Sequence, residues 1–315
     1  METVQTSRLF FRRKPVSVDA LAPSHRGEAR TAFVFLLPWL LGLIFLTTLP
    51  MAGSFVLSFS HYDLLSPPQW IGLENYERLL AHDPRYLKSL EVTTTYVLVS
   101  VPLSIAMALV IAVALSQQTP TANLFRGIFY LPSLLGGSVA VGVLWRQIFG
   151  GNGLVNMMLG GLGFQTTSWI GDPRYALWIL IILHIWQFGA PMVIFLAGVR
   201  QIPKEIVDAS IMDGASPVQR FFRITLPLLS PLILFNLVMQ TINAFQAFVP
   251  AFVISDGTGG PIDSTLFYTL YLYVEGFRNF RMGYAMAMAW VLLAIIAVFT
   301  AISFYASRFW VHYES

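Results

Sequence analysis

The chain has 315 residues, of which 56% are hydrophobic and 11% are charged, with a mean hydropathy of +0.67. A soluble domain carries roughly a quarter charged residues, so this composition excludes a water-facing surface and indicates an integral membrane protein. The net charge of +3 does not indicate nucleic-acid binding, because the basic residues are dispersed between apolar runs, and the absence of cysteine excludes disulfides, thiolate metal sites and cysteine catalysis.

Six charge-free runs follow a basic tail at residues 1–30, and each reaches the ~20 residues that a helix needs to cross a bilayer. They are 31–62, 92–125, 127–145, 175–199, 224–255 and 282–307. A seventh run, 147–171, contains GGNG, LGGLG and QTTS, which are poor helix formers, so we expect a loop with an interfacial piece there. The runs are too long for barrel strands and do not alternate. The sequence therefore predicts an all-α membrane domain over residues 31–307 with tails at 1–30 and 308–315.

The distribution of basic residues predicts the orientation. With the N-terminus inside, twelve of the nineteen Lys and Arg residues would lie in inner segments. An excess of Lys and Arg marks cytoplasmic segments, so we expect both termini inside.

Ionisable residues are missing from the middle of every predicted span. A carrier driven by protons or sodium typically needs one near the midplane, and only His184 could serve, although such a histidine is more often structural. A membrane enzyme is disfavoured too, because no acid–base or metal pair lies near a span end. The chain also lacks a GxxxxGK[ST] phosphate loop, so we expect it to bind no ATP, and it has no His/Asp/Glu cluster with metal spacing, so we expect no metal. Any uphill transport is expected to draw its energy from elsewhere.

The segment 200–224 is unusually charged for this chain. Pro203 suits a first helical turn, and Gly214 can take a left-handed position at the end of a helix over 203–212. Ser216 and Gln219 form a capping-box pattern that predicts a second helix from Pro217. Apolar residues recur on one side of the first helix, at Ile202, Ile206, Ala209 and Met212. Taken alone, this pattern also fits an amphipathic loop lying on lipid headgroups.

The segment DASIMDGASPVQRFFRITLPLLSP, residues 208–231, resembles the cytoplasmic EAA loop of permease subunits in binding-protein-dependent ABC importers. That pattern is Glu-Ala-Ala, three residues, Gly, then nine residues to Ile-x-Leu-Pro. Asp208-Ala209-Ser210, Gly214 and Ile224-Thr225-Leu226-Pro227 match its spacing, with Asp for Glu and Ser for Ala as departures. The segments AFVFLLPWLLGLIF, LSFSHYDLLSPPQWIGLENYERLL, FRGIFYLPSLLGGSVAVGVLWRQIF, FRMGYAMAMAWVLL and SRFWVHYE are similar to the sugar-importing branch, so the resemblance covers nearly the whole chain.

The resemblance implies a six-span type I ABC importer permease fold in the bacterial inner membrane. It implies that the chain moves a sugar or oligosaccharide, with a sugar phosphate or an acidic oligosaccharide still open. The implied partners are a second homologous permease, two ATPase subunits that carry ATP and Mg²⁺, an extracytoplasmic substrate-binding protein and membrane lipid. The loop is expected to contact the ATPase through Asp208, Ala209, Ser210, Asp213, Gly214 and Ala215.

Polar side chains within the spans are candidates for contact with a sugar. The fourth and fifth spans contain LHIWQFGAPMVIF and NLVMQTINAFQAF, which include the amides Asn236 and Gln246. Such amides often hold neighbouring helices together by hydrogen bonds. The residues alone therefore leave two alternatives, that these amides line the cargo pathway or that they join helices. The resemblance to maltose-type permeases places cargo contacts at His184, Gln187, Phe188, Pro191, Gln240, Asn243, Ala244 and Ala247.

Overall fold

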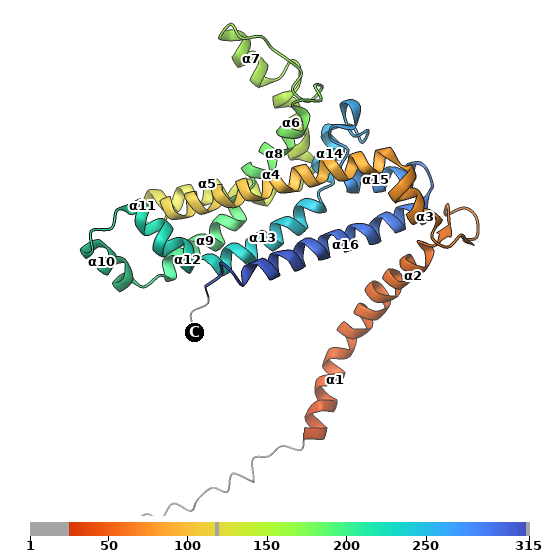
Figure 1. Cartoon of the computed structure of the whole chain (residues 1–315), viewed down its shortest axis with the longest axis horizontal. Coiled ribbons are helices and arrows are strands. Elements are labelled where there is room, and N and C mark those ends of the chain that lie inside the picture. Colours follow the sequence, from red (N-terminus) through yellow and green to blue (C-terminus); the bar gives the residue numbers. More distant parts are fainter. Residues whose placement is uncertain (1–24, 117–119, 313–315) are drawn as a thin grey trace, which may run out of the picture. The chain divides into compact units, whose positions relative to one another are not determined.

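The computed structural model describes residues 25–116 and 120–312 and divides the chain into two units, 1–54 and 55–315 (Figure 1). Most of the predicted tail 1–30 lies outside the described residues. The first unit begins with α1 (His25–Gly42) and the π-helical turn η2 (Leu43–Thr48), and α2 (Leu49–Leu57) continues into the second unit. These helices form a candidate membrane span over Arg30–Leu57.

The second unit starts with a short antiparallel pair, β1 (Ser60–His61) with β2 (Gln69–Trp70), and with α3 (Glu74–Glu77) and η3 (Arg78–His82). Its helices up to the charged loop are α4 (Pro84–Ala114), α5 (Pro120–Leu135), α6 (Val139–Phe149), α7 (Leu154–Gly161), α8 (Ala176–Trp186) and α9 (Gly189–Gln201). The charged loop holds α10 (Lys204–Met212), α11 (Pro217–Arg220), η4 (Phe221–Thr225) and α12 (Leu226–Leu228). The last elements are α13 (Ser230–Phe245), α14 (Val249–Ile254), η5 (Pro261–Asp263), α15 (Tyr268–Tyr273), η6 (Val274–Arg278) and α16 (Met282–Ser307).

The described residues include five candidate spans and one bent helix pair that completes a sixth. The sixth predicted span, 282–307, coincides with α16. The second predicted span corresponds to α4, which begins eight residues earlier than predicted. Asp83 caps α4, so the charged residues of the first turns belong to the helix. The third predicted span, 127–145, is not a straight helix, because α5 and the following helical segment 139–161 meet at an angle of 102°. The break falls at Gly136-Gly137, and Ser138 caps the new helix by accepting a hydrogen bond from the backbone N–H of Val141.

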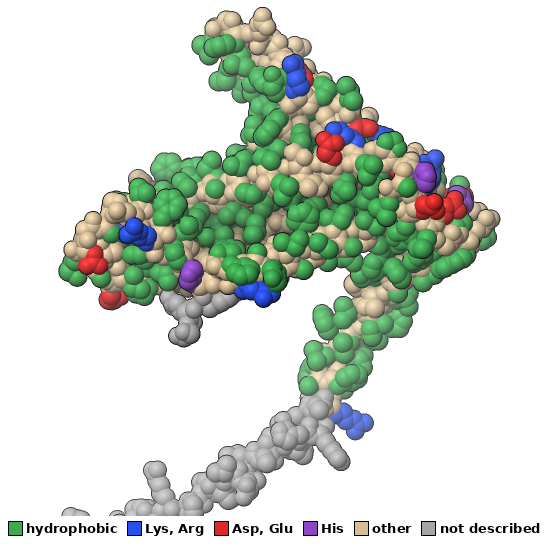
Figure 2. Space-filling view, viewed as in Figure 1, with side chains coloured by type: hydrophobic (Ala, Val, Ile, Leu, Met, Phe, Trp, Pro, Cys, Tyr) green, Lys and Arg blue, Asp and Glu red, His purple; other side chains and the backbone are tan. Residues whose placement is uncertain are grey.

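Helix α4 is the central element of the second unit, where it packs against α8, α9 and α13. Small residues such as Ser89, Ser100, Ser104 and Ala108 are buried along α4, which allows neighbouring helices to approach closely. Charged side chains gather at the two ends of this unit and apolar side chains cover its middle (Figure 2). This distribution fits a helical bundle in a bilayer.

A buried carboxylate ties three elements together at the end of the bundle opposite α10. Asp83 accepts hydrogen bonds from the hydroxyls of Tyr271 (2.7 Å) and Tyr284 (2.6 Å) and from the backbone N–H of Tyr86 (3.0 Å). Burial by itself would raise the pKa of Asp83, but the hydrogen bonds outweigh it and hold that pKa below its usual range. This contact fixes the start of α4 against α15 and α16.

Candidate functional site

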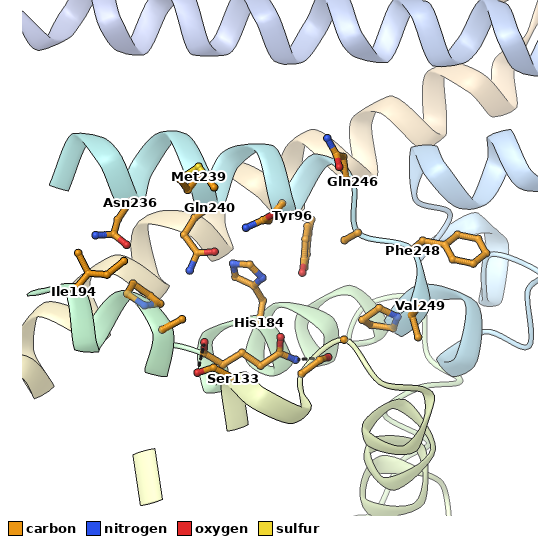
Figure 3. A pocket seen from close by; sticks show the side chains of 18 of the residues that line it. Tyr96, Ser133, His184, Ile194, Asn236, Met239, Gln240, Gln246, Phe248 and Val249 are labelled. Carbon is orange, nitrogen blue, oxygen red and sulfur yellow. Dashed lines mark hydrogen bonds between the residues drawn. The ribbon is translucent and has the colours of Figure 1, made fainter. Parts of the chain in front are cut away.

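A cavity of about 570 Å³ lies where the junction of α8 and α9 faces α13 (Figure 3). Residues of α4, of the end of α5 and of the start of α14 complete its lining. No Asp, Glu, Lys or Arg is among the described residues that line it. The cavity therefore offers hydrogen-bonding groups and apolar surface without a fixed charge.

The break between α8 and α9 forms one wall of the cavity. Gln187 follows the last residue of α8, and its side-chain amide donates to the backbone carbonyl of Gly136 at 3.0 Å. A Cβ on Gly189 would come within 2.5 Å of the backbone carbonyl oxygen of Phe129, so only glycine lets α9 approach α5 this closely. The two broken helices, α5–α6 and α8–α9, therefore support each other at the cavity wall.

His184 occupies the middle of this wall. Its ring packs edge-on against Tyr96, with the ring centroids 5.5 Å apart. Its Nε2 atom is buried and has no hydrogen-bond partner in the part of the chain that the structure describes. Figure 3 shows Gln240 reaching from α13 toward His184. A buried polar atom without a partner is uncommon in folded proteins, so the fold leaves the hydrogen-bonding capacity of His184 unsatisfied beside the cavity.

The opposite wall is the amide-bearing face of α13. Gln240, Asn243 and Gln246 line the cavity, and none of their side chains makes a hydrogen bond to another described residue. Asn236 also lines the cavity, but its amide donates to the backbone carbonyl of Leu232 at 2.9 Å. These contacts give no support to the reading in which Gln240 and Asn243 join helices of this chain by hydrogen bonds.

The structure brings six of the eight sequence-derived cargo residues to the cavity. They are His184, Gln187, Pro191, Gln240, Asn243 and Ala247. Phe188 and Ala244 are instead buried in the core and do not line it, and the ring of Phe188 packs on Phe129 at 5.8 Å. Sequence reasoning missed Tyr96, Ser133 and Gly136, although the Gly136-Gly137 pair was a signal for a break in the third span.

The charged loop has the local structure expected of it, with small shifts. Helix α10 begins at Lys204 with Pro203 as its N-cap, one residue later than predicted. Gly214 has a φ of +75°, and both hydrogen bonds of the Ser216–Gln219 capping box are present. Positive φ is favourable for glycine, so the sharp turn after α10 depends on this residue.

The two faces of α10 differ in burial. Ser210 is buried, and its hydroxyl donates to the carbonyl of Val207 at 2.6 Å. Among the other loop residues that the sequence predicted to contact the ATPase, Ala215 is half-buried. The exposed ones are Asp208, Ala209, Asp213 and Gly214. Met212 is 83% exposed. Helix α10 thus presents an acidic and apolar face away from its own chain.

The region 79–311 matches the family model of the binding-protein-dependent transport system inner membrane component. The chain is 50% identical over 300 residues to the probable ABC transporter permease protein YesP of Bacillus subtilis, covering 94% of this chain and 97% of YesP. It is 31% identical over 277 residues to the arabinooligosaccharides transport system permease protein AraP of Halalkalibacterium halodurans, covering 87% and 86% of the two chains. It is 34% identical over 242 residues to the lactose transport system permease protein LacF of Rhizobium radiobacter, covering 75% and 80%.

The fold is also similar to a solved structure, a bacterial ABC transporter involved in the import of the acidic polysaccharide alginate. The TM-score is 0.74 at 21% sequence identity, covering 90% of this chain and 97% of that chain. A second solved structure, a bacterial alginate ABC transporter in complex with an alginate pentasaccharide-bound periplasmic protein, gives a TM-score of 0.78 at 20% identity, covering 90% of this chain and 96% of that chain.

Proposed function

Because the chain belongs to the family of binding-protein-dependent transport system inner membrane components, we propose that it is one permease subunit of an ATP-driven importer for a sugar or oligosaccharide. The family places it in the inner membrane as a multi-pass protein. Relatives named for arabinooligosaccharide and lactose transport support a carbohydrate cargo. The remaining subunits would be a second permease, two ATPase subunits and a substrate-binding protein.

The amide-lined cavity is the observation that carries this proposal. Sugar hydroxyls need hydrogen-bond donors and acceptors, which the side-chain amides of Gln240 and Asn243 provide. Sugar C–H surfaces pack against aromatic rings, and Tyr96 and Phe248 lie in the same lining. A volume of about 570 Å³ lies within the range of small-molecule sites.

The uncharged lining favours recognition of hydroxyl groups by this chain. A carboxylate or phosphate on the cargo would find its cation on another subunit, since no Lys or Arg is among the described lining residues. The same lack of charge speaks against a secondary carrier, which needs an ionisable group near the midplane for coupling.

The exposed face of α10 is the proposed contact with an ATPase subunit. The small residue Ala209 lets a partner approach closely, and Asp208 can fix the register by pairing with a basic group. The capping box of α11 and the turn at Gly214 make the loop rigid. A movement of the ATPase can therefore be transmitted through the loop to the helices that flank it.

Uptake by the complete complex in proteoliposomes tests the proposal. We expect uptake of labelled sugar that requires internal ATP and loaded binding protein and that persists when an ionophore collapses the proton gradient. Uptake that stops with the gradient while ATP is intact would point to a secondary carrier instead.

A further inference from the structure

Helices α6 and α14 pack side by side (Figure 1). A Cβ added to Gly142 of α6 would come within 2.9 Å of the Cβ of Val253 in α14, so glycine allows this close approach. Farther along, Arg146 of α6 forms an ion pair with Asp256, which follows α14. The contacting residues advance together in both segments, so the two helices run in the same direction.

A second pocket, of about 490 Å³, lies where these two helices end, and we call it the outer pocket. The cargo cavity lies where the same helices start, since Gly137 and Val249 are in its lining. The eight residues from Ser138 to Arg146 rise about 12 Å along α6. The two pockets are therefore farther apart than the width of one sugar ring.

The outer pocket has a mainly polar lining. Its polar side chains are Arg146, Gln147, Ser168, Asp256 and Thr258. The amide of Gln147 is exposed and makes no hydrogen bond to another described residue. The charge of Arg146 is matched by that of Asp256, and Ile170 and Pro261 add apolar surface. Hydrogen-bonding groups next to small apolar surfaces suit a sugar ring, whose hydroxyls need partners and whose C–H faces need apolar contact.

The loop after α14, which forms one wall of the outer pocket, is held by three arginines. Arg85 of α4 forms a two-pronged ion pair with Asp263, with N–O distances of 2.6 and 2.8 Å. Arg278 of η6 donates to the carbonyl of Gly257 at 2.8 Å, and the arginine of α6 is the third. The backbone is strained, because φ is positive at the non-glycine residues Asp256, Ile262 and Asp263. A wall fixed in this way avoids the cost of ordering a mobile loop on binding.

One exposed face of α6 leads from the cargo cavity to the outer pocket. Ala140, Val143 and Gln147 are exposed and follow one another at spacings of three and four residues, so they share this face. None of them is charged. A sugar chain lying along this face can reach both pockets.

We propose that the outer pocket is a second sugar subsite, which holds one unit of an oligosaccharide while another unit of the same molecule lies in the cargo cavity. This inference rests on the proposed function and adds to it that the cargo has several sugar units. Gln147 and the Arg146–Asp256 pair bind the hydroxyl groups. Arg85, which holds the loop, lies in the first turn of α4, at the end of the bundle opposite α10. In the predicted orientation, cargo arrives from that side.

The test measures uptake as a function of sugar length. The complete complex in proteoliposomes, with its binding protein, receives a partial hydrolysate of plant and algal polysaccharides, and mass spectrometry counts the sugars of each length taken up per complex. Gln147→Leu removes the amide at similar volume, so initial uptake of trisaccharides and longer chains should fall about fivefold or more. Uptake of monosaccharides and disaccharides should stay within about twofold of the wild type, because they do not reach both pockets. Gln147→Trp fills the pocket and should show the same dependence on length.

Two measurements serve as controls. Gln165→Leu removes another exposed amide, outside the outer pocket, and should change no uptake. For Gln147→Leu, the melting temperature of the complex and the binding-protein concentration for half-maximal stimulation of ATP hydrolysis should equal those of the wild type. A rise in that concentration would assign the pocket to a side chain of the binding protein and overturn the inference.

The outcomes separate the inference from the proposed function. If the wild-type complex takes up sugars of no length, both are overturned. If the wild type takes up only monosaccharides and disaccharides, this inference alone is overturned. It is also overturned if Gln147→Leu leaves the uptake of long chains unchanged, if it lowers all lengths equally, or if Gln165→Leu shows an equal loss.

Discussion

Asn243 offers the sharpest test of the cargo cavity. Its side chain lies on the exposed face of α13, lines the cavity and makes no hydrogen bond to another described residue. Asn243→Leu keeps a similar volume but leaves one cargo hydroxyl without a partner during passage. The cost of an unpaired polar group is about 1–3 kcal/mol, which corresponds to a fall in transport of roughly five- to 150-fold.

The assay is uptake of labelled sugar per assembled complex in proteoliposomes, with the amount of complex measured separately. Met239 lines the same cavity without a hydrogen-bonding amide, so Met239→Leu is a matched control and should change uptake less than about twofold. Because Asn243 bonds to no described neighbour, its replacement should leave the melting temperature of the complex unchanged. If uptake per complex stays at the wild-type value, Asn243 has no place in the cargo pathway. If total uptake falls only in proportion to the amount of complex lost, the result favours a role in joining helices.

Four further predictions concern bulk, coupling, topology and stability. Ala247→Trp should block transport by filling the cavity, while basal ATP hydrolysis stays unchanged; normal uptake would remove this position from the pathway. Asp208→Lys should leave assembly intact but abolish stimulation of ATP hydrolysis by loaded binding protein, and wild-type stimulation would contradict the coupling role of α10. A cysteine at Ser216 should react with an impermeant thiol reagent only in inside-out vesicles and one at Ser66 only in intact spheroplasts, since the chain has no cysteine of its own; labelling of position 216 from outside would reverse the orientation. The pKa of Asp83 is held below its usual value of about 3.9, so its contribution to stability is present above about pH 4 and is lost as the pH falls through the lowered pKa. Asp83→Asn should therefore cost about 1–3 kcal/mol at pH 7 and flatten the acid side of a plot of melting temperature against pH, whereas parallel curves would show that the carboxylate is not the group responsible.

Local signals predicted the loop between α9 and α13 well. The capping box at Ser216 and the glycine at 214 depend on residues within one turn of each other, so their geometry follows from the sequence. Spans were predictable for the same reason, because a run of apolar residues has to be helical in a bilayer. Their ends were less certain, and Asp83 shows why: its capping role and its bonds to Tyr271 and Tyr284 join residues about 190 positions apart.

The cargo cavity was only partly predictable. Spacing places Gln240 and Asn243 on one face of α13, but it does not say which neighbour that face meets. Phe188 and Ala244 were expected at the cavity and are in the core, where the ring of Phe188 packs on Phe129 of α5. Tyr96 of α4 also lines the cavity, although it lies nearly ninety positions before His184 in the chain. Its contact with His184 depends on helix packing, so no local sequence pattern predicts it.

The sequence by itself determined that this protein is a helical membrane protein with an amide-bearing fifth span and a capped, charged loop, because these properties depend on composition and on residues within a few turns. The tertiary structure decided that the third span bends by 102°, that Gln187 bonds to Gly136 at this bend beside an uncharged cavity, and that three arginines contact a strained loop. Those features arise from side chains that are distant in the chain and meet only when the helices pack, and packing is set by the shape of all the neighbours at once.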